Sequence, residues 1–529
     1  MSPEQKKARV TAESMAERQR EISVSEFFSK NRHLLGFDNP QKALLTAIKE
    51  AVDNSLDACE EAGLLPALKV EIRQLAEDRF RIAVEDNGPG IVKAQIPKIF
   101  GKLLYGSKFH TLKQARGQQG IGISAAGMYG LLTTGKSIAI TSRTGHDKPA
   151  HYYEIQIDTR KNAPQIIMDK VVEWEPQHGT RVEIELIGTY KKGRHSVDDY
   201  IHQTAIANPH CEIFYLPPDS GGTQHFERGS DVLPPEPSEI KPHPYGVELG
   251  VLIRMMKETP ARYLSVALHR DFSRVSSRVA EEICKAADLN PNAKPHTIAV
   301  NEAERLYKAI NSVKIMSPAT NCLSPIGEEQ ILLGLQKEIA ADFYTAITRT
   351  PTVYRGNPFQ VEVGLAYGGS LPREELVDLM RFANRVPLQY QQSGCAITKA
   401  ALGIDWRSYG LSQSKGALPI GPVVLFIHIA SVWVPFTSES KEAVAPYPEI
   451  MRELRLALQE CGRKLAAHIR AHRRAADEEK KKSYIEKYIP HIGIALREIL
   501  GLSAKAEKDV VATLKDVLER SRSKERIDD

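Results

Sequence analysis

The stretch ALLTAIKEAVDNSLDA, from Ala43 to Ala58, constrains the fold of this chain more than any other segment. Its apolar residues recur at helical spacing, which predicts an amphipathic helix. Glu50, Asn54 and Asp57 are spaced i, i+4 and i+7, so they share one face of that helix. A lone pattern of this kind is typical of a solvated acidic face, so its meaning depends on the sequence that follows.

Three further blocks follow this stretch in a fixed order. FRIAVEDNGPGI, from Phe80 to Ile91, has the pattern of a strand that ends in Asp-Asn-Gly-Pro-Gly. RGQQGIGISAAG, from Arg116 to Gly127, is a glycine-rich loop that opens a helix, and His178-Gly179-Thr180 introduces another strand. Together with the first helix, these blocks resemble the nucleotide-binding signature of the GHKL ATPases, the group of gyrase, MutL and the histidine kinases.

The resemblance implies a chemical role for the polar residues of each block. Asn54 offers an amide oxygen to Mg²⁺, a hard cation that takes few protein ligands. Glu50, one helical turn earlier, can polarise a water toward the γ-phosphate of ATP. Asp86, where a strand ends, can accept a hydrogen bond from the adenine amino group. We therefore expect ATP and Mg²⁺ as cofactors, with Glu50 catalytic and Asn54 as the metal ligand.

Glycine-rich turns complete the expected nucleotide site. Gly88 and Gly90 let the backbone approach the base closely, where a Cβ would intrude. The loop from Gly117 to Ser124 presents backbone N–H groups and a helix N-terminus to phosphate oxygens. The full set of expected nucleotide-binding residues is Asn54, Asp57, Asp86, Gly88, Gly90, Ser107, Lys108, Gly117, Gln118, Gln119, Gly120, Ile121, Gly122, Ile123, Ser124, Thr180 and Lys441.

The chain is long enough for several cores and carries little net charge. Its length of 529 residues, of which 42% are apolar, suggests about three or four domains. A net charge of only +5 means that any nucleic-acid surface must be local. The six cysteines form no C-x-x-C pair, which argues against a zinc site and a disulfide framework. A reducing cytoplasm is the expected compartment.

No membrane segment is expected. The N-terminal stretch is charged and helix-prone without an apolar core, so it does not have the pattern of a secretory signal. Only Gly416 to Thr437 is uncharged and long enough to span a bilayer. Its prolines and the runs VVLF and ASVWV, which are rich in β-branched and aromatic residues, favour a buried strand instead.

One segment matches the Walker A pattern G-x-x-x-x-G-K-S, from Gly130 to Ser137. That motif binds phosphate only when a strand precedes it and a helix follows. Here the residues from Ser124 to Leu132 predict a helix, and SIAITSR predicts the strand after it. We therefore expect Gly135 to cap the end of a helix and not to contact phosphate.

The rest of the chain narrows the resemblance to one family. The segments SPIGEE, TRTP-x-x-Y-x-G-x-PF, GLAYGGS, FANRVPL and DWRSYG resemble the transducer domain of the topoisomerase VI B subunits. The front of the chain, FF-x-KN-x-x-L-GF-x-NP, extends the likeness to nearly the whole sequence. Between these parts, a proline-rich linker and an all-helical patch resemble the helix-two-turns-helix insert of that family.

The expected fold is a multidomain α/β (α+β) protein. The domains run in the order of an N-terminal arm over residues 1–39, a GHKL (Bergerat) ATPase sandwich over 40–235, a helical insert over 236–318, a βαβ transducer over 319–470 and C-terminal helices over 471–529. The apolar arm is expected either to pack on its own domain or, as the resemblance implies, to strap across a second copy. The C-terminal helices are expected to contact the A subunit that the resemblance implies.

Further site residues follow from the same resemblance. Lys441, on a loop after the long apolar strand, matches the family's switch lysine, which reaches the γ-phosphate from the transducer. A basic turn contains Lys191, Lys192 and Arg194, and such a turn either touches DNA or is a plain solvated loop. The residues Trp406, Arg407 and Tyr409 resemble a Trp-Lys-x-Tyr element, with Arg in place of Lys, and are also expected to contact DNA.

The function implied is that of the ATP-hydrolysing B component of a type IIB topoisomerase. ATP would close a B homodimer around one DNA duplex, while two A subunits of an A2B2 heterotetramer cut another. This chain shows no nucleophilic tyrosine motif of its own. The alternatives are a MutL-like repair ATPase or a GHKL chaperone, both of which would lack the helical insert and the Trp406 element. A histidine kinase would need a phosphoacceptor hairpin before the nucleotide block.

Overall fold

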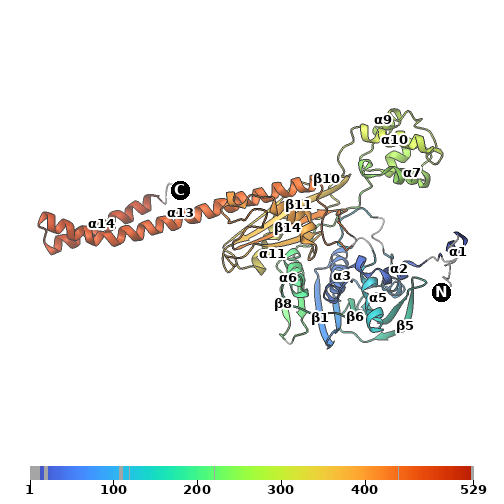
Figure 1. The fold of residues 1–529 in the computed structure, drawn as a ribbon, viewed down its shortest axis with the longest axis horizontal. Coiled ribbons are helices and arrows are strands. Elements are labelled where there is room, and N and C mark those ends of the chain that lie inside the picture. Colours follow the sequence, from blue (N-terminus) through green and yellow to red (C-terminus); the bar gives the residue numbers. More distant parts are fainter. Residues whose placement is uncertain are drawn as a thin grey trace, which may run out of the picture. The chain divides into compact units, whose positions relative to one another are not determined.

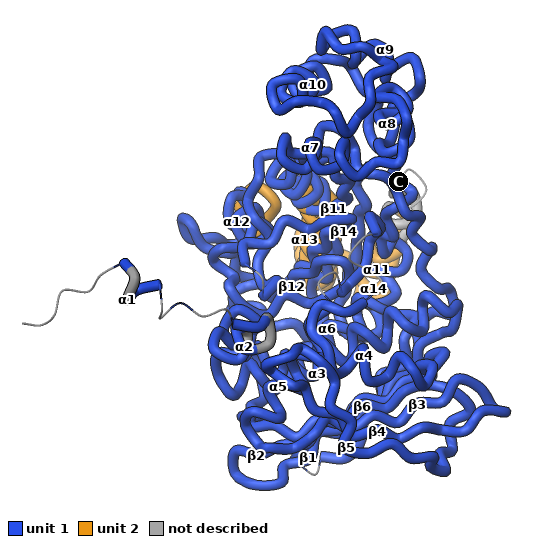
Figure 2. The backbone as a smooth tube through the Cα atoms, turned by 90° about the vertical axis from the view of Figure 1, so that its right-hand side faces the viewer, with its two compact units in different colours: residues 1–405, 412–461 blue, residues 406–411, 462–529 orange. Residues whose placement is uncertain are grey.

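The structure is a computed structural model that describes residues 12–16, 19, 22–106, 111–117, 120–219, 221–438 and 440–525. The chain divides into two compact units, one of residues 1–405 with 412–461 and the other of residues 406–411 with 462–529 (Figure 2). The first unit mixes helices and strands, which is the expected α/β character, and the second is helical. Within the described residues, no helix has the length and apolar character needed to cross a membrane.

An eight-stranded sheet forms one layer of the first unit. Its strands are β1 (Ala67–Ala76), β2 (Arg79–Asp86), β3 (Ile138–Arg143), β4 (Ala150–Asp158), β5 (Ala163–Val172), β6 (Gly179–Ile187), β7 (Glu212–Leu216) and β8 (Gln224–Phe226). Their order is β5-β4-β3-β6-β2-β1-β7-β8, and only β1 and β7 pair in parallel. One face is covered by α3 (Pro40–Glu61), α4 (Ile96–Gly101), α5 (Gly122–Thr134) and α6 (Val197–Ala207) (Figure 1). This two-layer arrangement buries the largest apolar core of the unit between helices and sheet.

Helix α3 is fixed at its start by its own sequence. The side chain of Asn39 accepts a hydrogen bond from the backbone N–H of Lys42 at 2.9 Å. Pro40 takes the first turn, where a missing N–H costs no hydrogen bond. The helix therefore begins at Pro40 instead of the expected Ala43. Its apolar face is fully buried, and each such leucine or isoleucine contributes about 1.5–3 kcal/mol to folding.

The Walker-like segment has the predicted order of helix and then strand. Helix α5 ends at Thr134, and Gly135 follows in the left-handed conformation at φ 72°. The N–H of Gly135 donates to the carbonyl of Leu131, which closes the helix end. Strand β3 then begins at Ile138. The prediction that Gly135 is a helix cap is confirmed, and Lys136 lies at the wrong end of a helix to bind phosphate as a P-loop lysine does.

A helical insert follows the first sheet and has a core of its own. It consists of η3 (Pro244–Gly246), α7 (Leu249–Glu258), α8 (Leu264–Asp271), α9 (Ser277–Ala286), η4 (Pro295–Thr297) and α10 (Val300–Ser312). Leu252, Leu268, Ile283 and Leu306 are buried together between these helices. The hydroxyl of Tyr245 donates to the carbonyl of Val313 at 2.6 Å and so ties the two ends of the insert together.

A second, six-stranded sheet carries the later part of the first unit. Its elements are α11 (Glu328–Glu338), β9 (Phe343–Thr348), β10 (Thr352–Tyr354), β11 (Asn357–Tyr367), β12 (Asp378–Ala383), β13 (Val386–Pro387), η5 (Gln392–Gly394), α12 (Ala396–Leu402) and β14 (Val423–Ser431). The strand order is β10-β11-β14-β12-β13, with β9 paired to β11. Strands β12 and β14 run parallel and are joined through α12, which is the expected βαβ unit. Every residue of β14 is buried, as predicted for the uncharged stretch around it.

The N-terminal arm consists of α1 (Ala12–Ala16), α2 (Val24–Lys30) and η1 (Arg32–Leu35). The hydroxyl of Ser23 donates to the carbonyl of Thr159 in the same chain. Helix α1 instead lies away from the sheet in both views (Figures 1 and 2), and Met15 is 59% exposed. The arm therefore rests on its own chain from Ser23 onward, whereas α1 does not.

The second unit is a helical hairpin. It contains η6 (Trp406–Tyr409), the part of α13 (Pro448–Leu500) after Cys461, and α14 (Ala504–Glu525). Helices α13 and α14 lie side by side (Figure 1), and Arg497 pairs with Glu507 at 2.8 Å. The turn between them uses Gly501 in the left-handed conformation at φ +62°. Several apolar side chains of α13 stay exposed, among them Tyr484, Ile499 and Leu500.

Candidate active site

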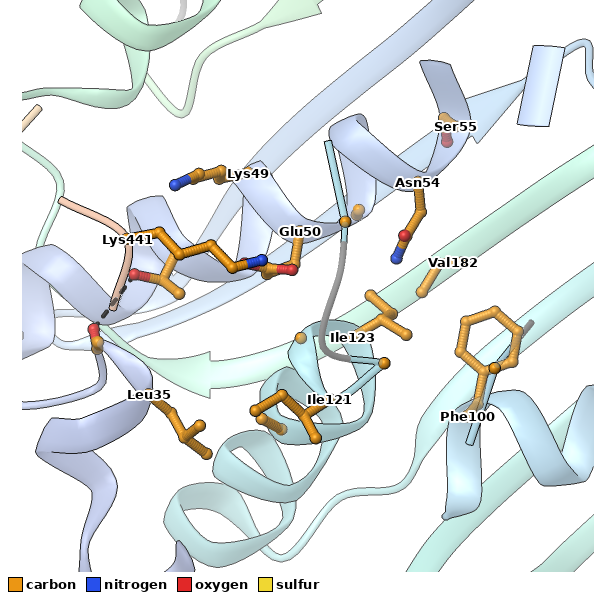
Figure 3. A pocket seen from close by; sticks show the side chains of 18 of the residues that line it. Leu35, Lys49, Glu50, Asn54, Ser55, Phe100, Ile121, Ile123, Val182 and Lys441 are labelled. Atoms are coloured by element: carbon orange, nitrogen blue, oxygen red, sulfur yellow. Dashed lines mark hydrogen bonds between the residues drawn. The ribbon is translucent and has the colours of Figure 1, made fainter. Parts of the chain in front are cut away.

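A cavity of about 670 Å³ lies in the first unit, between α3 and the loops of the second sheet. Figure 3 shows side chains from α3, from the start of α5 and from the loop after β14 around one space. The walls combine apolar residues such as Ile121 and Phe100 with a few polar groups. A largely apolar cavity with convergent polar groups is typical of a small-molecule site.

Asp86 forms the polar group at the floor of the cavity. It is the last residue of β2, and its Oδ1 accepts hydrogen bonds from the N–H groups of Gly88 at 2.9 Å and Thr180 at 3.1 Å. Its Oδ2 accepts from the hydroxyl of Ser55 at 2.9 Å. Burial raises the pKa of Asp86, although these three donors oppose the rise. A carboxylate offers about four acceptor positions, so one on Oδ2 remains for a donor in the cavity.

The turn after Asp86 is held against the neighbouring strands. Gly90 has φ +70°, and a Cβ there would lie 2.0 Å from the carbonyl oxygen of Arg143. Glycine is therefore required at position 90 by the protein's own backbone. Nδ1 of His178 and the carbonyl oxygen of Gly88 are 2.8 Å apart and hydrogen-bonded. These contacts fix the base of the cavity before any ligand binds.

Glu50 and Asn54 project from α3 into the cavity (Figure 3). The first turn of α5 passes directly over Glu50, because a Cβ on Gly122 would lie only 1.7 Å from Glu50 Oε2. Gly117 lies similarly beside Asn54, where an added Cβ would lie 3.9 Å from Oδ1. The first turn of α5 and the loop before it thus lie against Glu50 and Asn54, and the N–H groups of a helix N-terminus favour anions.

Lys441 enters the cavity beside Glu50 from the loop between β14 and α13. It takes the left-handed conformation at φ +53°, and Figure 3 shows its amino group directed at the carboxylate of Glu50. Burial lowers the pKa of Lys441, and the negative charge of Glu50 partly offsets that effect. The loop after β14 of the second sheet therefore places a lysine beside α3, which packs on the first sheet.

Most of the predicted nucleotide-binding residues in the described part of the chain meet at this cavity. Those that line it are Glu50, Asn54, Asp86, Gly90, Gly117, Gly120, Ile121, Gly122, Ile123, Thr180 and Lys441. Gly88 and Ser124 do not line the cavity. The N–H of Gly88 donates to the carboxylate of Asp86, and the hydroxyl of Ser124 donates to the carbonyl of Ile99 at 2.8 Å. The predictions for Ser107, Lys108, Gln118 and Gln119 fall outside the described residues.

Asp57, which was also expected to bind the nucleotide, does not line this cavity and is held by Arg116. Arg116 Nη1 donates to Asp57 Oδ1 at 2.9 Å, and the same guanidinium binds both oxygens of Glu60 at 2.7 Å. These charges are buried, so the fork of Arg116 compensates two carboxylates at once. Asp57 therefore holds the residue that precedes Gly117 and does not contact the cavity itself.

Sequence reasoning missed this network and a second buried acid. Asp53 accepts a hydrogen bond from the hydroxyl of Tyr200 at 3.1 Å, and burial raises its pKa to about 7. The side-chain amide of Asn384 donates to the carbonyl of Ala115 at 2.9 Å and so links the second sheet to the loop before Arg116. Asp53 is adjacent to Asn54 in the sequence, but no pattern in the sequence signals the Asn384 contact, since 269 positions separate its partners.

The predicted DNA residues fall into two groups. Lys191, Lys192 and Arg194 are exposed on the loop after β6, and Lys192 pairs with Asp219. Arg407 is exposed as well. Trp406, however, is 0% exposed, so its ring does not offer the surface that a contact with DNA requires. Its ring lies 6.1 Å from that of Tyr409, which indicates that the tryptophan supports the turn and leaves Arg407 to face solvent.

The fold and the site define a GHKL-type ATPase. The family model of the histidine kinase-, DNA gyrase B- and HSP90-like ATPases matches residues 39–187, and that of the topoisomerase VI B subunit transducer matches residues 318–482. The B subunit of type 2 DNA topoisomerase 6 from Methanosarcina acetivorans is 51% identical over 94% of this chain and 79% of its own length. Its counterpart from Archaeoglobus fulgidus is 47% identical over 92% of this chain and 80% of that protein. The chain belongs to the family of type 2 DNA topoisomerase 6 B subunits, which confirms the predicted resemblance.

Proposed function

We propose that the cavity binds ATP with its adenine at Asp86 and its γ-phosphate between Glu50 and Lys441. The observation that carries this proposal is the position of Glu50 and Lys441. Glu50 lies on α3, which packs on the first sheet, and Lys441 lies on the loop after β14 of the second sheet. Both side chains lie near the N-terminus of α5. The free acceptor position of Asp86 suits the adenine amino group. The backbone N–H groups at the start of α5 can bind phosphate oxygens without the help of additional cations.

Asn54 would hold Mg²⁺ in this site. Its amide is an oxygen donor that lines the cavity beside Gly117. No cluster of three or more His, Cys, Asp or Glu able to hold a metal occurs among the described residues, so a bound cation must rely on few protein ligands. Mg²⁺ accepts such sites because waters and phosphate oxygens complete its shell, and when bound it would neutralise charge on the phosphates.

Glu50 would act on the attacking water. Its carboxylate takes a proton from the water as the water oxygen bonds to the γ-phosphorus, and the bond from that phosphorus to the β-γ bridging oxygen breaks. Lys441 offers a charge-assisted hydrogen bond to the γ-phosphate before hydrolysis. Once the phosphate departs, that contact is lost, and the second sheet is released from the nucleotide-binding layer.

The chain would work with an A subunit that cuts DNA and with a second copy of itself. ATP-bound chains would pair around one duplex while another is passed through the A-subunit break, in an A2B2 assembly. The exposed Lys191, Lys192 and Arg194 and the exposed Arg407 have the charge needed to contact duplex phosphates. Neither a repair ATPase nor a chaperone is favoured over this function, given the family of the chain.

The proposed function predicts coupling between ATP turnover and DNA. We expect the chain mixed with its A subunit to hydrolyse ATP faster when duplex DNA is added, and to relax supercoiled DNA only when ATP is present. Parallel reactions without the A subunit should show no relaxation. A turnover rate that DNA leaves unchanged, or relaxation without ATP, would reject the proposed coupling.

ATP should also control pairing between copies of this chain. We expect sedimentation to show mostly monomers without nucleotide and dimers with a non-hydrolysable ATP analogue. Removing residues 1–21 should weaken the dimer, because α1 makes no close approach to its own sheet, whereas Ser23 and α2 remain in place. Equal dimer content with and without this segment would contradict the strap.

A further inference from the structure

The loop that carries Lys441 reaches helix α3 at a second point. The carboxylate of Glu442, the next residue, lies 2.5 Å from the Nζ of Lys42 in the first turn of α3. Both side chains are enclosed, since that of Glu442 is 8% exposed and that of Lys42 is 11% exposed. An ion pair held this far from solvent is much less screened than a surface pair and has a defined geometry.

Lys42 is itself held in place by three neighbours. Its amino group also lies 2.9 Å from Asp38 Oδ1 and 5.4 Å from the centre of the Tyr390 ring, while its backbone N–H is bound by Asn39. Burial alone would lower the pKa of Lys42, but Glu442 and Asp38 outweigh it and raise that pKa. Lys42 therefore stays charged and presents a fixed cation to the loop.

The loop's own hydrogen bonds close the loop on itself, including the bond from the N–H of Lys441 to the carbonyl of Ser438 at 3.1 Å, so its placement on α3 needs a further contact. Phe436 and Val444 pair across the base, and the N–H of Thr437 donates to the carbonyl of Ala443 at 2.9 Å. Toward the tip, Lys441 adopts a left-handed backbone conformation, which is uncommon for a residue other than glycine, asparagine or aspartate. A conformation of this kind persists where surrounding contacts enforce it.

We propose that Lys42 and Glu442 are positioning residues that set the register of this loop on α3, so that Lys441 lies at Glu50. The two successive loop residues have opposite charges, and each meets its opposite on the helix. A shifted loop would bring Glu442 toward Glu50 and Lys441 toward Lys49 or Lys42, which like-charge repulsion disfavours. The inference rests on the proposed role of Lys441 at the γ-phosphate.

The inference predicts a kinetic effect that a general loss of stability does not produce. Lys42→Met or Glu442→Gln in the full chain should lower kcat for ATP about tenfold to a hundredfold, within the range of coupling measured between contacting residues, and leave ADP affinity unchanged. Arg349→Met is the matched control. It breaks a partly buried pair with Glu453 at 3.2 Å beside the second sheet and should change thermal stability but not kcat.

Combined variants separate positioning from other effects. If Glu442 acts through Lys441, then Glu442→Gln added to Lys441→Ala should cause no further loss of kcat, and Lys42→Met with Glu442→Gln should cost no more than the larger single change. The inference is overturned if Glu442→Gln lowers kcat as strongly in the Lys441→Ala protein as in the unaltered chain. It is also overturned if the single variants Lys42→Met and Glu442→Gln have normal kcat. If Lys441→Ala itself keeps normal turnover, the proposed function of Lys441 fails first, which distinguishes the two failures.

Discussion

Glu50→Ala is expected to lower ATP turnover by at least about 100-fold, the usual contribution of a positioned general base, while ATP affinity changes little. The reason lies in the geometry of the cavity, where Glu50 faces the α5 N-terminus and Lys441, whereas the carboxylate of Asp86 is bonded to other groups, namely Ser55, Gly88 and Thr180. Removing the carboxylate takes away the acceptor for the proton of the attacking water. Steady-state turnover and calorimetric titration with a non-hydrolysable analogue measure the two quantities separately.

Glu61→Ala is the matched control for this change. Glu61 is the last residue of the same helix, is exposed and does not line the cavity. We expect that variant to hydrolyse ATP at the normal rate. Near-normal turnover by Glu50→Ala, or a loss of turnover equal in both variants, would show that Glu50 does not carry the chemistry.

Lys441→Ala is expected to keep ADP affinity, to lose most ATP turnover and to fail in strand passage when mixed with the A subunit. Loss of the ammonium group removes about 1.5–3 kcal/mol of charge-assisted bonding, and that loss falls on the state with a γ-phosphate. Adenine binding should be spared because Asp86 is held by Ser55, Gly88 and Thr180 and not by Lys441. Turnover, ADP titration and relaxation of supercoiled DNA test the three statements.

Lys399→Ala provides the control, on the α-helix that precedes β14. Lys399 lies exposed on α12 and contributes nothing to the cavity lining. It should behave as the unaltered chain in all three assays. A Lys441→Ala protein that relaxes DNA at the normal rate would make Lys441 an ordinary lysine without a role in coupling.

The sequence predicts most of the nucleotide-binding end of the fold because its signals are local. The i, i+4 spacing places Glu50 and Asn54 on one face of α3, and the glycine at 135 ends α5 before β3. The prediction of a buried strand in the uncharged stretch around β14 is confirmed, since prolines and β-branched residues flank and fill it. Such features depend on spacing within one segment, which a single sequence displays directly.

Features that depend on distant partners could not be predicted. Asp57 satisfies the same helical spacing as Glu50 and Asn54, yet it is held by Arg116 and does not line the cavity. Between strands β12 and β13, Asn384 and Arg385 form a left-handed turn, and Asn384 bonds Ala115, which no local pattern indicates. Trp406 shows the same limit, because an aromatic motif does not reveal whether its ring is buried.

The most direct test is a crystal structure of the chain with Mg²⁺ and a non-hydrolysable ATP analogue. We expect the adenine amino group to bond Asp86, the cation to bind Asn54, and the γ-phosphate to contact Lys441 with a water between it and Glu50. Lys42 and Glu442 should remain paired. An analogue bound elsewhere, or a γ-phosphate out of reach of Lys441, would contradict the proposal that this lysine links the nucleotide to the second sheet.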